Sequence, residues 1–307
     1  MAKYVLTRLL GAIPTLFLIV TGAFFLIRIA PGGPFDRERT LEPTVMENLN
    51  RMFLLDRPLW EQYVNYLSNL LQGDFGPSFI YRDFTVGELL ASGLPVSMTL
   101  GALALVFALL VGGLLGVIAA LRQNTWVDYS VIVIATFGIT VPNFVVAPLL
   151  ALIFGVWLSL LPAGGWNGGA LPNLVLPVIA LGLPQVAVVA RLIRGAMIEA
   201  LGADHIRTAR AYGLQTRMIV VTHALRTACL PAVSYLGPAA AGLLTGSIII
   251  EQIFGLPGIG RYFVTAALNR DYTLVMGTVV IVAIFVVLFN LLVDILYALL
   301  DPRVRYD

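Results

Sequence analysis

The longest stretch of this chain without a charged residue lies between Asp128 and Arg191 and contains 62 residues. A transmembrane helix needs about 20 apolar residues, so this stretch is too long for one crossing and long enough for two. Glycines and prolines between residues 161 and 173 divide it and predict a turn between the two crossings. Because lipid offers no partner to exposed backbone groups, such a chain is predicted to fold as transmembrane helices.

Four other stretches are long, apolar and almost free of charge. Only 12% of the residues are charged, against about 25% in soluble domains. The sequence therefore predicts an all-α, polytopic membrane protein with six transmembrane helices in a single domain, residues 1–307, embedded in a lipid bilayer. The predicted spans cover about residues 9–29, 96–121, 129–157, 172–194, 228–250 and 273–300.

The first apolar run, Leu9 to Ile27, has two interpretations, a membrane span or a cleaved signal peptide. It is charge-free for 19 residues, longer than the roughly 7–15 residues of a signal-peptide core. The sequence Arg28-Ile-Ala-Pro that follows is a poor cleavage context. We therefore expect a span.

The distribution of Lys and Arg predicts the orientation. Six spans put both termini on one side, and that side carries 11 basic residues, all in short segments, against seven on the other. Five of those seven lie in residues 30–95, which also hold nine acids. The positive-inside rule then places both termini and the loop 195–227 in the cytoplasm. Apolar residues at helical spacing after Asp56 and Pro58 predict that residues 30–95 form a small helical extracytoplasmic cap.

The sequence gives little support for catalysis, metal binding or nucleic-acid binding. One cysteine, Cys229, and two histidines, His205 and His223, make a metal cluster improbable, so no metal site and no catalytic residue is predicted. The net charge of +2 gives no reason to expect nucleic acid as a partner. The single lysine, Lys3, stands near the N-terminus, outside any phosphate-binding loop, so we expect any ATP to be hydrolysed by another chain.

The loop 195–227 is basic, and within it residues 206–214 are predicted to form a short helix. Arg207 and Arg210 supply charge, the small residues Ala209 and Ala211 allow close approach of another surface, and Gly213 provides a helix terminus. This pattern is typical of a docking site. The alternative is an ordinary basic cytoplasmic loop.

The same loop resembles the EAA loop of bacterial ATP-binding-cassette importer permeases. IRTARAYGL followed by HALRTACLP is most similar to the oligopeptide, dipeptide and nickel branch, although Arg207 and Thr208 stand where the general motif has Glu and Ala. The resemblance covers the whole chain and is closest to the B-type permease subunit of oligopeptide importers. The other matching segments are RLLGAIPTLF, GDFGPSF, LPAGGWNGGALPN, GLPGIG, ALNRDY and VDILYALLDP.

This resemblance implies a role for specific residues of the loop. Carried over position by position, it implies a helix that couples the permease to an ATPase. The implied coupling residues are Arg207, Thr208, Ala209, Arg210, Ala211, Gly213 and His223.

The resemblance also implies an assembly in the bacterial inner membrane. Its expected partners are a second homologous permease, two cytoplasmic subunits that bind ATP and magnesium, and an extracytoplasmic peptide-binding protein. The expected substrates are oligopeptides. Dipeptides, nickel chelates and other small peptide conjugates remain alternatives.

Two further questions stay open from the sequence. An ion-gradient-driven carrier would need acids near the middle of the membrane, and the available ionisable residues, Arg28, Glu251 and Asp294, lie near predicted span ends. The fifth span is rich in small residues and either lines a substrate path or packs against neighbouring helices. Its candidate path residues are Ser234, Tyr235, Thr245 and Ser247.

Overall fold

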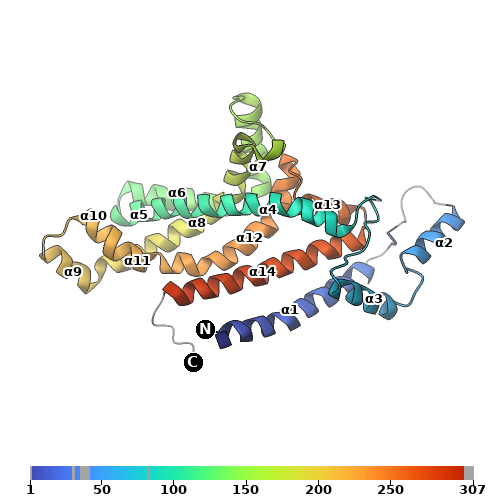
Figure 1. Ribbon diagram of the computed structural model, residues 1–307. Coiled ribbons are helices and arrows are strands. Elements are labelled where there is room, and N and C mark those ends of the chain that lie inside the picture. Colours follow the sequence, from blue (N-terminus) through green and yellow to red (C-terminus); the bar gives the residue numbers. More distant parts are fainter. Residues whose placement is uncertain (1, 30–31, 35–41, 82, 301–307) are drawn as a thin grey trace.

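A computed structural model describes residues 2–29, 32–34, 42–81 and 83–300, and the side chains of residues 2–6, 238, 244–246, 294 and 296–300 lie outside this description. The described residues form helices joined by turns and loops, and their one β-contact is an isolated bridge between Pro77 and Thr85. The long helices run along one axis and make an elongated bundle (Figure 1). We call the end that carries α2, α3 and α13 the cap end, and the end that carries α9 and α10 the loop end.

The elements follow one another along the chain in this order: α1 (Ala2–Ile29), α2 (Pro43–Met52), α3 (Leu59–Leu71), α4 (Val86–Phe107), η1 (Ala108–Gly112), α5 (Gly113–Leu121), α6 (Trp126–Thr140), α7 (Asn143–Leu150), η2 (Ala151–Trp157), η3 (Asn167–Gly169), α8 (Leu171–Gly202), α9 (Asp204–Ala211), α10 (Thr216–Met218), η4 (Ile219–Ala224), α11 (Leu225–Ala228), α12 (Leu230–Phe254), α13 (Ile259–Leu268) and α14 (Tyr272–Leu300).

The prediction of an all-α, polytopic membrane fold is confirmed. Five helices among the described residues are long and apolar enough to cross a membrane, or up to seven if each of two bent helix pairs counts as one span. The predicted number of six lies within this range and stays a prediction, as do the cytoplasmic termini.

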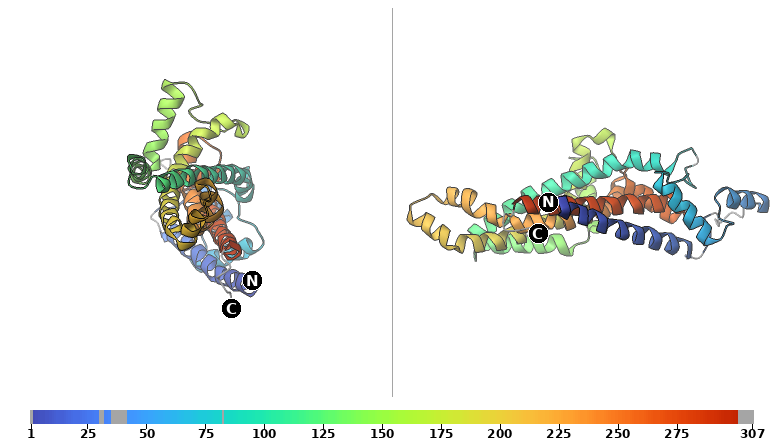
Figure 2. Two further views of the ribbon diagram at one scale, coloured as in Figure 1. Left: turned by 90° about the vertical axis from the view of Figure 1, so that its left-hand side faces the viewer. Right: turned by 60° about the horizontal axis from the view of Figure 1, so that its bottom comes forward.

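The predicted third span, residues 129–157, is not one straight helix. α6 and the continuous α7–η2 segment meet at an angle of 103°, and α7 and η2 rise from the side of the bundle (Figures 1 and 2). The break falls at Val141, which is extended with φ −83° and ψ 119°, directly before Pro142. Proline disfavours the helical conformation of the residue before it, which explains the position of the bend.

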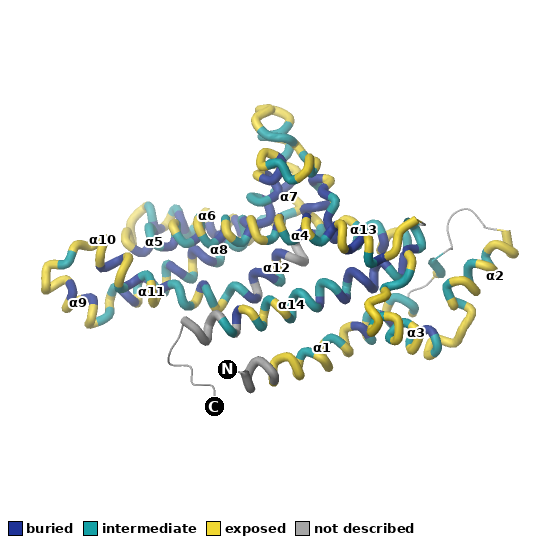
Figure 3. The backbone as a smooth tube through the Cα atoms, in the orientation of Figure 1, coloured by how far each residue is buried: buried dark blue, intermediate teal, exposed yellow. Residues whose placement is uncertain are grey.

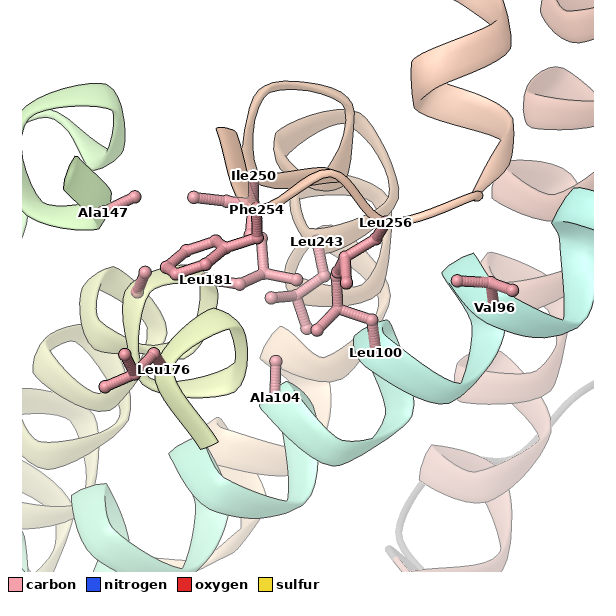
Figure 4. Packing of buried hydrophobic residues seen from close by; sticks show 11 residues of the cluster. Val96, Leu100, Ala104, Ala147, Leu176, Leu181, Leu243, Ile250, Phe254 and Leu256 are labelled. Atoms are coloured by element: carbon pink, nitrogen blue, oxygen red, sulfur yellow. The ribbon is translucent and has the colours of Figure 1, made fainter. Parts of the chain in front are cut away.

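α8 is the central helix, and α4, α5, α6 and α12 all pack against it. The close approach of η1 and α5 to α8 depends on small residues. A Cβ atom on Gly112 would lie 2.6 Å from the backbone oxygen of Val186, and one on Gly116 would lie 2.6 Å from that of Ala190. Gly112 and Gly116 therefore serve helix packing. Towards the cap end, Leu100, Leu181, Leu243 and other apolar side chains of α4, α8 and α12 form one buried cluster (Figure 4).

The cap is attached to the bundle through aromatic and polar contacts. The ring of Phe24 in α1 lies 5.2 Å from that of Tyr63 and 5.8 Å from that of Tyr66, both in α3. At the start of α14, the buried carboxylate of Asp271 accepts hydrogen bonds from Ser78 Oγ (2.5 Å) and the backbone N–H of Phe79 (2.9 Å). The predicted helical segment after the first span is thus present and fixed to α1 and α14.

Candidate functional site

At the loop end, α9 has a buried face and an exposed face. Ile206 and Ala209 are buried in an apolar cluster with Met197 of α8 and Ile219 of η4. The exposed face presents the side chains of Arg207, Thr208, Arg210 and Ala211. In Figure 3, both buried (dark blue) and exposed (yellow) positions are marked along α9. Of the predicted coupling residues on α9, Ala209 therefore supports the helix from inside, and the other four are available to a partner.

Gly213 provides the C-terminal end of α9, as the sequence predicted. Its φ of +76° lies in the left-handed region. Its N–H donates to the carbonyl of Arg210 (2.9 Å), and the N–H of Leu214 donates to the carbonyl of Ala209 (3.2 Å). This pair of bonds is a Schellman motif, which satisfies the last carbonyls of a helix and favours glycine at this position. α9 itself begins two residues before the predicted helix and ends three residues earlier.

The charges on α9 differ in their surroundings. Arg207 lies 3.5 Å from Asp204, but both side chains are exposed, so this ion pair contributes little. Arg210 makes no ion pair with any residue that the structure describes. Arg210 is thus the cation of α9 that is best placed to meet an acidic partner.

His223, the seventh predicted coupling residue, lies apart from the exposed face of α9. It is half-buried in the π-helical turn η4, which packs against α9, and its Nδ1 is buried without a hydrogen-bond partner among the described residues. π-helical turns occur frequently at functional sites. The structure places His223 behind the α9 surface.

Sequence reasoning missed the apolar part of this surface. Tyr212 is 83% exposed, directly between the predicted residues Ala211 and Gly213. Met218 and Val221 are also exposed at the loop end. A large aromatic residue beside a helix-terminating glycine in a polar loop was the available signal, since exposed aromatic residues are typical of interfaces. We call the exposed residues Arg207, Thr208, Arg210, Ala211 and Tyr212 the α9 surface.

The four candidate path residues are not brought together on one exposed face of α12. Ser234 is exposed, whereas Ser247 is 1% exposed. The hydroxyl of Tyr235 donates to Gln185 Oε1 of α8 at 2.7 Å. The side chain of Thr245 lies outside the described residues. Packing therefore accounts for Tyr235 and Ser247.

Ser247 belongs to a buried polar cluster around Glu251, where α12 bends into α13. The fully buried carboxylate of Glu251 accepts hydrogen bonds from Ser97 Oγ of α4 (2.6 Å) and from the N–H of Gly260 (2.8 Å). A Cβ atom on Gly258 would lie 2.6 Å from Ser97 Oγ, so this position has no space for a side chain. The glycines of GLPGIG thus form a tight turn that closes over the carboxylate of Glu251.

An ion pair that the sequence analysis did not anticipate joins α6 to α8 near the loop end. Arg194 Nε lies 2.5 Å from Asp128 Oδ1, and its Nη2 lies 2.7 Å from Oδ2. Asp128 is fully buried, and its Oδ2 also accepts from the N–H of Asn124. This two-pronged geometry fixes the start of α6 against the part of α8 that leads to α9.

Comparison with known proteins places these features in a family. Residues 112–306 match the family described as binding-protein-dependent transport system inner membrane component, and residues 1–99 match the N-terminal part of such membrane components. The chain is 53% identical over 306 residues to the oligopeptide transport system permease protein OppB of Escherichia coli, with both chains covered completely. It is 51% identical over 306 residues to OppB of Haemophilus influenzae, again over the whole of both chains.

A more distant relative is the dipeptide transport system permease protein DppB of Bacillus subtilis. The two are 43% identical over 305 residues, which cover 99% of this chain and 98% of the relative. With its apolar helices, the chain is a multi-pass protein of the bacterial inner membrane. It belongs to the inner membrane component family of binding-protein-dependent transport systems, the permeases of ATP-binding-cassette importers.

Proposed function

We propose that this chain is one of two permease subunits of an ATP-driven importer for oligopeptides. An extracytoplasmic binding protein delivers the peptide at the cap end, and two cytoplasmic ATPase subunits, which hold ATP and magnesium, bind at the loop end. The α9 surface is the observation that carries this proposal. The oligopeptide class is supported by the 53% identical relative, and dipeptides are the second candidate because of the 43% identical one.

The packing of α9 suggests how ATPase movement reaches the membrane. The two buried residues of α9, Ile206 and Ala209, contact both α8 and η4. η4 continues through α11 into α12, so a force on α9 acts on two long helices together. Because close-packed interiors transmit displacement, a rigid shift of α9 moves the loop ends of α8 and α12.

The test is peptide-stimulated ATP hydrolysis by the complete importer in proteoliposomes. Arg210→Glu reverses the unpaired charge of the α9 surface and is expected to lower stimulated hydrolysis about tenfold, which is typical of losing a charged interface contact. Arg122→Glu, at an exposed position in the turn between α5 and α6 and outside the α9 surface, is the matched control and should leave it unchanged. Equal rates in both variants would contradict the proposal. Uptake of a pentapeptide against a dipeptide distinguishes the two substrate classes.

A further inference from the structure

At the cap end of α1, one cation lacks a counter-charge. Arg28 donates from Nε to Gln62 Oε1 (2.9 Å), and its guanidinium carbon lies 3.8 Å from the centre of the Phe24 ring. Its Nη1 is buried without a hydrogen-bond partner, and none of the ion pairs among the described residues includes Arg28. A guanidinium carries five N–H donors, and buried unpaired donors are costly. Among the described residues, no carboxylate therefore pairs with Arg28.

A second unpaired group lies nearby. The hydroxyl of Tyr66 in α3 is buried without a hydrogen-bond partner, and the Tyr66 and Phe24 rings are 5.8 Å apart. Burial raises the pKa of Tyr66 to about 12, although the nearby Arg28 lowers it, so the phenol remains a neutral donor at physiological pH. Two unpaired donors thus flank the same Phe24 ring.

Arg28 borders two cavities. The larger, about 550 Å³, is lined by residues 32–34, by α1, α2 and α3 with the loop before α3, and by the start of α14. Among the described residues that line it, Arg28 is the only charged one. Asn50 and Gln62 contribute amides to it, and Met46 and Leu59 contribute apolar surface. The smaller, about 160 Å³, is lined by both Arg28 and Tyr66, and Asp74 also lines it, with Oδ1 accepting from the N–H of Gly76 (2.8 Å). The larger cavity is the one suited to an anion with an apolar portion.

We propose that this cavity binds the phosphate group of an anionic phospholipid, with Arg28 as the binding cation. The planar guanidinium presents paired donors that match phosphate oxygens. Arg28 stands at the end of the candidate span Thr7–Ile29, at the depth where the hydrocarbon region gives way to headgroups. Beside it, α3 exposes Trp60 and Leu71, and tryptophan is typical of the membrane interface.

The position of the cavity favours a lipid over a transported peptide. α1 packs against α14. α14 lies between α1 and the group α4, α8 and α12 (Figure 1). The cavity is therefore at the periphery of the bundle, and α14 separates it from the central helix α8. A peptide carboxylate would share the charge but would have to reach this outer side.

The experiment measures lipid binding to the full chain, purified with the importer subunits that accompany it and then delipidated. Native mass spectrometry gives the dissociation constant for dioctanoyl phosphatidylglycerol. Arg28→Gln is expected to raise this constant at least tenfold, and Arg28→Lys, which keeps the charge without the planar fork, should have a smaller effect. Arg51→Gln removes an exposed charge from the neighbouring α2 and should change the constant less than twofold.

Two competitors identify the source of the anion. The soluble headgroup fragment sn-glycerol 3-phosphate should compete only at much higher concentration, because it lacks the acyl chains that fill the apolar part of the cavity. Trialanine, which carries a free carboxylate, should not compete. Equal constants for Arg28→Gln and Arg51→Gln would overturn the proposal, and so would displacement of the lipid by trialanine at comparable concentration.

Tyr66→Phe provides a second test that does not disturb the cation. In the lipid-free chain the hydroxyl is unpaired, so its removal should leave the melting temperature equal or higher. Because Tyr66 lines the smaller cavity and not the larger one, its removal should change the phosphatidylglycerol dissociation constant less than twofold. A Tyr66→Phe chain that loses as much affinity as Arg28→Gln would place the phosphate in the smaller cavity and contradict the proposal.

Discussion

Individual glycines decide whether two turns of this protein can form, and they do so for different physical reasons. Gly213 has a φ of +76° but open space around its missing Cβ. Gly258 has an ordinary φ of −93° and no space at all, because Glu251 and Ser97 occupy the place of a side chain. The first position is restricted by backbone conformation and the second by packing.

Gly213→Ala is predicted to destabilise the end of α9 by about 1–2 kcal/mol, the cost of a left-handed conformation in a residue with a Cβ. Gly213→Asn is the control, because asparagine tolerates this conformation better. The measurement is peptide-stimulated ATP hydrolysis of the complete importer, in which alanine should impair coupling and asparagine should largely preserve it. An alanine variant that couples as well as the asparagine variant would disprove the strain argument.

Gly258→Ala is predicted to lower the melting temperature of the purified protein by several degrees, because overpacking a tight site costs about 1–3 kcal/mol. Gly195→Ala is the matched control, since a Cβ on Gly195, inside α8, would meet nothing within 4 Å. Alanine there should be neutral or slightly stabilising, as helix propensity favours it. Similar melting temperatures for both variants would show that the Glu251 turn can adjust.

At the scale of the elements, three buried carboxylates hold helix ends in place through hydrogen bonds or an ion pair with neighbouring elements. Asp271 connects the cap to α14, Glu251 connects α13 to α4, and Asp128 connects α6 to α8. Each carboxylate lies at or near a bend or a helix start, where backbone N–H groups lack partners within the helix.

The Asp128–Arg194 pair is predicted to act as a unit. Asp128→Asn and Arg194→Gln should each destabilise the protein, because each leaves a polar group without its charged partner. The double variant should lose less than the sum of the two, with an interaction free energy of about 1–3 kcal/mol. Thermal or denaturant unfolding of the four proteins in the same detergent provides the double-mutant cycle. Additive losses would mean that the two residues act independently.

At the scale of the whole molecule, the bundle exposes apolar side chains on α6 and on the α7–η2 segment, including Phe137, Phe144 and Trp157. In a membrane protein such faces are suited to contact with lipid or with other subunits. The distribution of Lys and Arg predicts that the α9 surface lies in the cytoplasm and the cap outside.

The predicted orientation can be tested by cysteine labelling in a Cys229→Ser background. Arg210→Cys should react with an impermeant maleimide only after the membrane is opened, and Ser68→Cys in α3 should react in intact cells. Both positions are exposed in the structure, so a failure to label cannot be attributed to burial. The reverse pattern would invert the topology and place the α9 surface outside.

The sequence by itself determined the helical membrane fold and the position of the short helix α9. Long charge-free runs can only be buried in lipid as helices, and Arg207, Arg210 and Gly213 mark a polar loop with a helix end. The left-handed conformation of residue 213 could be predicted from the glycine itself, because this conformation depends only on local backbone geometry.

Only the tertiary structure decided which polar residues face one another. Asp128 and Arg194 are 66 positions apart, and Ser97 and Glu251 are 154 apart, so no local pattern joins them. The bend at Pro142 was not predicted, because proline is tolerated inside many membrane helices and its effect depends on the packing of α6 and α7. The candidate path residues of α12 illustrate the same limit, since hydrophobicity does not reveal which face of a buried helix contacts its neighbours.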